Sequence, residues 1–184
     1  MKQKGFTLIE ILIVVFIIAM VAGMAGLSLQ NDPRSKEMER EAKRLKFYLE
    51  MASDEAVFQN IDLGFFMTKN QLHPFVWEVV EEADPNDPES EDKYGWKAFE
   101  NRLVNKFEFP EDYEQLVKID GQEITLTFTL PDDEDEIQPQ MYIASSGEQP
   151  VAEIELTLEE FNISYFIRGQ GLGRYDIEQV TYEE

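Results

Sequence analysis

The chain has no cysteine and only one histidine among its 184 residues. Without cysteine it forms no disulfide, uses no thiolate as a nucleophile and holds no cysteine-ligated zinc. The single histidine, His73, precedes a proline in an extended segment, and no second histidine stands at metal-ligand spacing, so we interpret it as structural. The sequence lacks the Gly-x-Ser-x-Gly elbow of hydrolases, and Gly169–Gly173 does not follow the spacing of a dinucleotide-binding loop. We therefore expect neither enzymatic activity nor a bound cofactor.

Basic residues are scarce outside the first quarter of the chain. The whole sequence has 38 acidic and 16 basic residues, a formal net charge of −22. Six of the basic residues fall between Arg34 and Lys46, whereas residues 47–184 carry 33 acidic and 8 basic residues, a net charge of −25. Such a surface repels the phosphate backbone of nucleic acids, so we exclude nucleic acid as a partner.

One long apolar run, Phe6–Leu29, is interrupted only by Thr7, Glu10 and Ser28. As a helix these 24 residues would extend roughly 36 Å at about 1.5 Å per residue, enough to cross the ~30 Å hydrocarbon core of a bilayer. A removable signal peptide has an apolar segment of only about 7–15 residues. The run therefore predicts a membrane-spanning helix over residues 6–29 rather than a removable signal.

Glu10 is an acidic residue inside this apolar run. A carboxylate in a membrane span costs on the order of 2.5–3.5 kcal/mol, and such residues usually face a partner. The next basic residue along the chain is Arg34, beyond helical reach, and Lys4 lies outside the apolar end of the run. A carboxylate with no partner in its own span suggests a partner on another chain.

The segment Lys4-Gly5-Phe6-Thr7-Leu8-Ile9-Glu10, followed by about 19 apolar residues, resembles the N-terminus of type IV pilins and of type II secretion pseudopilins. The resemblance implies that residues 1–5 are a leader peptide, which a prepilin peptidase removes by cutting between Gly5 and Phe6. It further implies that the new amino group of Phe6 is methylated. Glu10 would then pair with the Phe6 ammonium of a neighbouring subunit during filament assembly.

The basic residues Lys2 and Lys4 in the leader predict the orientation of the chain, because positive charge stays on the cytoplasmic side of a membrane. We expect a single-pass protein of the bacterial inner membrane with a cytoplasmic N-terminus. Residues 30–184 would form a globular domain in the periplasm.

A second helix is predicted over residues 35–59, with Ser35 as its N-cap. Apolar residues recur there at steps of three and four, which is typical of one buried helical face. The residues of this face are Met38, Ala42, Leu45, Leu49, Ala52 and Ala56.

Beyond Asn60 the apolar residues alternate, which predicts a β-rich region over residues 60–184. A turn over 68–71, a charged and proline-rich loop over 81–94 and a hairpin at Asp120-Gly121 separate the expected strands. The expected strands are Ile61–Phe65, Leu72–Val80, Leu116–Ile119, Ile124–Leu130, Gln140–Ala144, Ala152–Leu158, Phe161–Ile167 and Tyr175–Tyr182. The fold class is α+β, and it matches the pilin-like architecture, in which a long N-terminal helix, half transmembrane and half amphipathic, packs on antiparallel sheet.

Within the pilin-like proteins, three features are most similar to the minor pseudopilin H subfamily of the type II secretion system. They are the helix–strand pattern through Gln59–Phe66, the long loop ending in Tyr94-Gly95-Trp96, and the segment Tyr142–Glu148 before a strand. The resemblance implies a structural subunit of a periplasmic filament that drives export of folded proteins across the outer membrane. Its implied partners are the prepilin peptidase, other major and minor pseudopilins, the inner-membrane assembly platform and exported substrates.

Two other functions compete with this one. A minor type IV pilin, serving adhesion, twitching or DNA uptake, would carry the same N-terminal motif. A plain membrane-anchored periplasmic binding domain would leave Glu10 and the Gly5–Phe6 junction without a role.

The acidic loops raise a weaker hypothesis, because carboxylates are the ligands that calcium prefers. The candidate ligands are Asp84, Asp87, Asp132 and Asp133. Neither loop has the EF-hand spacing with its central glycine, and prolines interrupt the first. We favour solvated acidic loops and expect no metal site.

Overall fold

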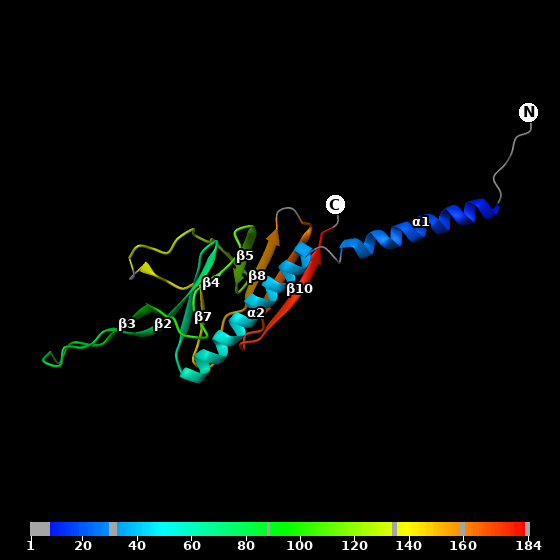
Figure 1. Cartoon of the computed structure of the whole chain (residues 1–184). Coiled ribbons are helices and arrows are strands. Elements are labelled where there is room, and N and C mark those ends of the chain that lie inside the picture. Colours follow the sequence, from blue (N-terminus) through cyan, green and yellow to red (C-terminus); the bar gives the residue numbers. More distant parts are fainter. Residues whose placement is uncertain (1–7, 30–32, 88, 134–135, 159–160, 183–184) are drawn as a thin grey trace, which may run out of the picture. The chain divides into compact units, whose positions relative to one another are not determined.

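The computed structural model describes residues 8–29, 33–87, 89–133, 136–158 and 161–182 (Figure 1). The chain divides into two compact units, Met1–Met38 and Glu39–Glu184. Helix α1 (Leu8–Leu29) belongs to the first unit, and helix α2 (Pro33–Gln59) crosses the boundary between the two. All the strands belong to the second unit.

Helix α2 begins at Pro33, two residues before the predicted N-cap. The assignment of Ser35 as N-cap is therefore wrong: Ser35 lies inside the first turn of the helix and is 8% exposed. Proline suits the first helical position because its fixed φ is already helical and its missing N–H has no acceptor there to lose.

The predicted buried face of α2 is confirmed. All six of its residues are 0% exposed: Met38, Ala42, Leu45, Leu49, Ala52 and Ala56. Three of the six are alanines, and their small side chains let the helix approach the strands closely. The helix ends at Gln59, as predicted, where Asn60 adopts a positive φ of 55° and stops it.

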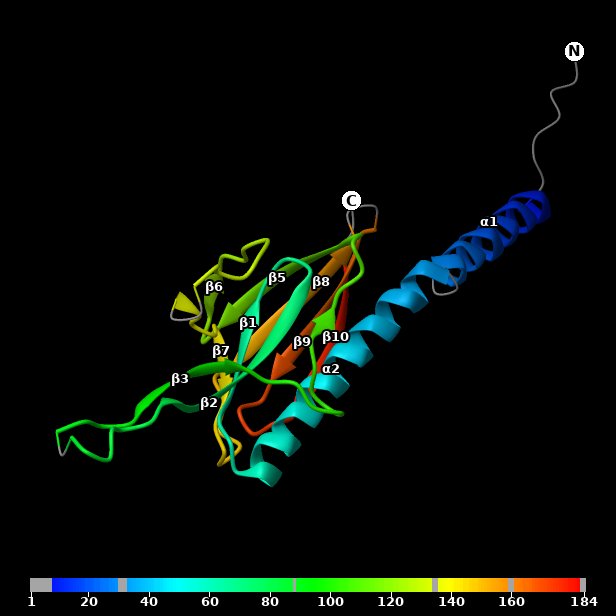
Figure 2. The ribbon, with the colours of Figure 1, turned by 60° about the vertical axis from the view of Figure 1, so that its left-hand side comes forward.

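Two antiparallel sheets make up the rest of the second unit (Figure 2). The first sheet has the order β3-β2-β1-β7, and β4 pairs with β2. Its strands are β1 (Leu63–Met67), β2 (Gln71–Glu81), β3 (Lys93–Ala98), β4 (Phe107–Glu108) and β7 (Met141–Ile143). The second sheet has the order β10-β9-β8-β5-β6. Its strands are β5 (Tyr113–Ile119), β6 (Gln122–Ile124), β8 (Ala152–Leu158), β9 (Ile163–Gly169) and β10 (Tyr175–Thr181).

Helix α2 contacts both sheets. The ring of Tyr48 lies 6.0 Å from that of Phe65 on β1, and the Tyr48 hydroxyl donates to the carbonyl of Asn105 at 2.6 Å. Burial raises the pKa of this phenol. On the side of the second sheet, the backbone N–H of Tyr175 donates to the Glu50 carboxylate at 3.2 Å. The α+β prediction is therefore confirmed, with one helix holding two sheets together.

Three strands differ from the prediction. Strand β3 begins inside the segment expected to be a loop. Tyr94, Trp96 and Ala98 alternate there with more polar residues, but the run is only six residues long and its side chains are exposed or half-buried. Strand β4 has only two residues. The predicted strand Ile124–Leu130 is wrong beyond Ile124, since the chain there leaves the second sheet and Thr127 forms a bridge to Thr68 beside the first.

The two predicted turns are confirmed. Thr68 and Gln71 close the β1–β2 connection through a 2.9 Å backbone hydrogen bond. Asp120 and Gly121 connect β5 to β6 with φ of 50° and 78°, the two positive values of a type I′ turn. Asp120 also accepts a hydrogen bond from the Val151 N–H at 3.0 Å, which ties the turn to the start of β8.

Candidate functional site

Helix α1 is the first candidate site, because its described side chains between Leu8 and Met20 are apolar and exposed. The described large apolar side chains from Leu8 to Met20 are 51–83% exposed. An isolated helix that is apolar on all sides exposes surface that water disfavours, so its stable environment is lipid or other apolar helices. Within the described residues, no helix combines the length and the apolar character that a membrane span requires.

The predicted leader and cleavage residues precede this helix in the sequence. Gly5, Phe6, Lys2 and Lys4 fall outside the described residues. Glu10 lies in α1 on the backbone trace, and its side chain is outside the described part. The predicted roles of these residues in cleavage, methylation and assembly therefore stay predictions.

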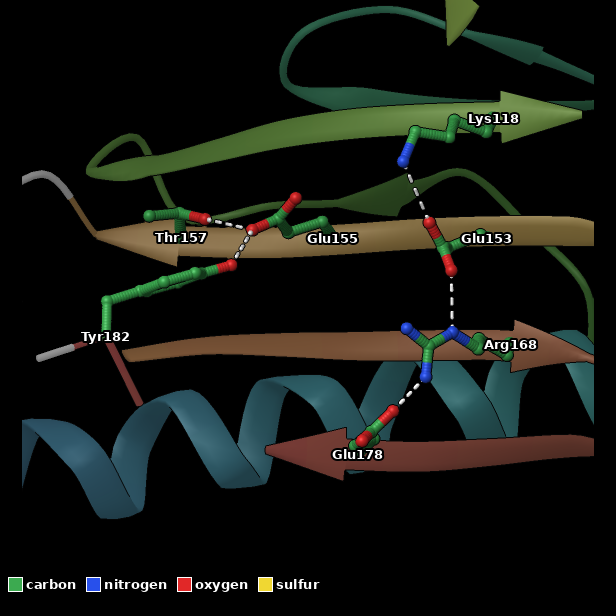
Figure 3. Close-up of polar contacts among 7 residues, drawn as sticks. All are labelled: Lys118, Glu153, Glu155, Thr157, Arg168, Glu178 and Tyr182. Carbon is green, nitrogen blue, oxygen red and sulfur yellow. Dashed lines mark hydrogen bonds and ion pairs between the residues drawn. The ribbon is translucent and has the colours of Figure 1, made fainter. Parts of the chain in front are cut away.

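The second sheet carries a row of ion pairs on its outer face (Figure 3). Glu153 on β8 accepts from Lys118 on β5 at 3.1 Å and from Arg168 Nε on β9 at 2.6 Å, and Arg168 also pairs with Glu178 on β10. The hydrogen bond from Arg168, followed by that from Lys118, lowers the pKa of Glu153. These charges crosslink four neighbouring strands and neutralise one another, so we interpret the row as structural.

The ion pairs of Glu153 predict that the free energy of unfolding falls at acid pH. Because the folded pKa of Glu153 is depressed, its contribution is present above its usual pKa of 4.5 and is lost as the pH falls through the folded value. We expect Glu153→Gln to unfold more easily than the parent chain at about pH 7, and the difference between them to shrink towards about pH 3. Urea unfolding at both pH values measures this, with the exposed Glu114→Gln on β5 as control. An equal difference at both pH values would contradict the prediction.

The first acidic loop holds two of its carboxylates in local turns. Asp84 accepts from the Asn86 backbone N–H at 2.8 Å, and Asp87 accepts from that of Glu89 at 3.0 Å. Among the described residues, which include Asp132 and Asp133, no group of three or more histidine, cysteine or acidic side chains is arranged to hold a metal ion.

His73 lies on β2, where burial and then the charge of Lys106 lower its pKa. Gly169–Gly173 forms part of the β9–β10 hairpin connection, with positive φ at Gly171 and Gly173.

An aromatic groove on the first sheet is the feature that sequence reasoning missed. Its aromatic residues are Trp77 on β2 with Tyr94 and Trp96 on β3. The groove has a volume of about 650 Å³ and is also lined by Ile137 and Pro139 from the segment before β7. Its signal in the sequence is that Trp77 and Trp96 are the only tryptophans of the chain, but only the strand register places them opposite each other.

Comparison with known proteins decides between the candidate functions. Residues 1–26 match the family described as the prokaryotic N-terminal methylation motif. A type II secretion system protein H from Pseudomonas aeruginosa is 30% identical over 149 residues, which cover 79% of this chain and 78% of the relative. This chain belongs to the type II secretion system protein H family. A protein H from Aeromonas hydrophila is 23% identical over 190 residues, which cover 100% of this chain and 97% of that relative.

Solved structures show the same fold. Two structures of the minor pseudopilin EpsH from the type II secretion system of Vibrio cholerae match with TM-scores of 0.51 and 0.53, each at 16% identity. The matches cover 79% and 81% of this chain and 97% and 96% of theirs. The protein is thus a minor pseudopilin of the type II secretion system with a pilin-like fold, and the type IV pilin alternative is not supported.

Proposed function

We propose that this pseudopilin is processed and assembled through its first ten residues. A prepilin peptidase removes residues 1–5 by cutting between Gly5 and Phe6, and the new Phe6 amino group is methylated. The observation that carries this proposal is the match of residues 1–26 to the N-terminal methylation motif.

The physical role of Glu10 follows from the cost of its charge. A carboxylate alone in an apolar span costs on the order of 2.5–3.5 kcal/mol, and the ammonium of Phe6 is also costly to bury among apolar helices once the leader is removed. Pairing Glu10 of one subunit with Phe6 of the next offsets both costs and sets the axial register between the two helices. Assembly is therefore favoured only after cleavage has created the amino group.

The apolar segment 6–29 anchors the subunit in the bacterial inner membrane as a single pass before assembly. The apolar sequence of the run and the exposed apolar side chains of α1 support this anchoring. Lys2 and Lys4 keep the N-terminus cytoplasmic, which places the domain over residues 30–184 in the periplasm.

The role of the subunit is structural rather than enzymatic. It contributes to a periplasmic filament that pushes folded proteins through an outer-membrane channel. Its partners are the prepilin peptidase, other major and minor pseudopilins, the inner-membrane assembly platform and exported substrates. Membership of the protein H family supports this role.

Mass spectrometry of the N-terminus tests the proposal. Chain purified from cells with the peptidase should begin at N-methylated Phe6, because the enzyme cuts after Gly5. Gly5→Val should leave Met1 in place, since a branched side chain replaces the glycine at the cut, whereas Gln3→Ala in the same leader should be processed normally. Retention of Met1 in the parent chain, or cleavage after Ala25, would refute the proposed processing.

A further inference from the structure

The aromatic groove continues a strip of apolar side chains along one face of the first sheet. Phe66 and Phe75 form a buried cluster with Ile137, and Trp96 and Leu130 pack against it. Further along β2 the aromatic side chains are no longer buried. Trp77 is 42% exposed, and Tyr94, beside it on β3, is 56% exposed. The end of the strip at Trp77 and Tyr94 is therefore exposed, whereas the end at Phe66 and Phe75 is covered by Ile137 and Leu130.

The rings of the open end are held in place by one another. The Trp77 ring lies 5.2 Å from that of Trp96 and 6.4 Å from that of Tyr94, stacked on the latter at an interplanar angle of 20°. Trp96 sits over Gly64, where a Cβ would lie 2.8 Å from its ring. Ordered aromatic rings bind a partner without losing much conformational freedom, which favours recognition.

The edge of β3 lies beside these rings. In the described part of the chain, β3 pairs with β2 on one side, and no strand pairs with its other side. Figure 2 shows the β2–β3 hairpin projecting from the two sheets, and the residues of β3 are exposed or half-buried. Main-chain groups of an edge strand bind an extended peptide, and neighbouring pockets take its alternate side chains.

The charge around the groove selects the partner. Lys93 and Lys97 on β3 are paired with Glu81 and Glu78 on β2, at 2.5 and 3.0 Å. The loop over residues 82–92, which connects the two strands, then adds six acidic residues and no basic one. The potential beside the groove is therefore negative, which attracts a basic segment and repels an acidic one.

We propose that the open groove of Trp77, Tyr94 and Trp96 binds an extended, basic segment of a partner protein along the edge of β3. This inference rests on the proposed role as a filament subunit with protein partners. It names the surface and the chemistry of one such contact. The aromatic rings supply apolar contact, the β3 edge supplies main-chain hydrogen bonds, and the acidic loop supplies charge complementarity.

Tryptophan fluorescence tests the proposal directly, because both tryptophans of the chain line the groove. The probes are two short synthetic peptides without tryptophan, tyrosine or proline. One alternates lysine with valine, and the other has glutamate in place of each lysine. Titrated into the detergent-solubilised full chain, the lysine peptide should change the emission saturably. It should bind at least about tenfold more tightly than the glutamate peptide, and more weakly at about 300 mM salt than at about 50 mM.

Variants separate the aromatic contribution from the charge. Tyr94→Ala should weaken binding of the lysine peptide by about tenfold, as expected for an aromatic anchor. Tyr142→Ala is the matched control, because Tyr142 is 54% exposed on β7 of the same sheet, outside the groove. The double variant Glu82→Gln with Glu91→Gln should bind the lysine peptide more weakly than the parent chain does. Its preference for the lysine peptide over the glutamate peptide should also be smaller. Asp84 and Asp87 are not replaced, because their carboxylates accept the hydrogen bonds that hold the turns of the loop.

Equal binding of the two peptides, binding of neither, or equal losses in Tyr94→Ala and Tyr142→Ala would overturn the proposal. Saturable binding of a chito-oligosaccharide with no peptide binding would assign the groove to a glycan instead.

N-terminal processing of Tyr94→Ala and of the parent chain distinguishes failure of the groove proposal from failure of the proposed function. If the variant is processed and assembled normally and the parent chain binds neither peptide, only the groove assignment fails. If the parent chain is not processed, the proposed function fails.

Discussion

Replacing Glu10 with alanine is expected to abolish incorporation into filaments while leaving membrane insertion and leader removal intact. The substitution makes the apolar run more apolar, so insertion is not impaired. It leaves the Phe6 ammonium of the neighbouring subunit without its counter-charge. Breaking a buried ion pair by removing one partner costs on the order of 3–5 kcal/mol, which lowers the assembly constant by about two orders of magnitude or more.

Sheared filaments from cells that overproduce the secretion system measure this effect, with the cell membranes assayed in parallel for the unassembled subunit. Glu10→Gln should behave like Glu10→Ala, because the amide keeps the shape and loses the charge. Ser28→Ala removes an uncharged polar group near the far end of the same run and should assemble normally. Parent-like incorporation of Glu10→Ala would show that the charge pair is dispensable.

Replacing Leu49 with alanine is expected to lower the free energy of unfolding by about 2–5 kcal/mol. Leu49 is 0% exposed on the face of α2 that is buried against the strands, so the substitution removes buried apolar contacts and leaves a cavity. Losses of this size are a large fraction of the stability of an ordinary domain. The unit Glu39–Glu184 should therefore become prone to unfolding.

Phe47→Ala is the matched control on the same helix. Phe47 lies two residues earlier and is 65% exposed, so its replacement should change the free energy of unfolding by no more than about 0.5 kcal/mol. Urea unfolding of the detergent-solubilised chains, followed by the fluorescence of Trp77 and Trp96, gives both values. If the two variants lost similar stability, the predicted one-sided burial of α2 would be incorrect.

Local patterns predicted several elements because each is specified by residues close together in the chain. The apolar face of α2 follows from a spacing of three and four, and all its members are buried. The turn at Asp120-Gly121 follows from residues that tolerate positive φ. The α+β fold could be inferred at the same stage from the helical and alternating patterns, and the pilin-like resemblance from the segment Lys4–Glu10. The resemblance to the protein H family came from the segments Gln59–Phe66, Tyr94–Trp96 and Tyr142–Glu148.

Other features depended on contacts between distant residues. The alternation over Ile124–Leu130 predicts a strand, yet the chain leaves the sheet after Ile124 because Thr127 pairs with Thr68 far away in the sequence. Strand β3 is a short run directly after a charged loop, and β2 supplies its hydrogen-bond partners. A sequence window contains no information about such a partner.

The sequence by itself therefore determined the chemistry of the N-terminal segment, the charge of the domain and the buried side of α2, since each depends on residue type and short-range spacing. Only the tertiary structure decided that Trp77 and Trp96 stand opposite each other and that Lys118, Glu153, Arg168 and Glu178 form one row. Strand register brings these residues together, and register is set by the packing of whole strands against the helix rather than by any single segment.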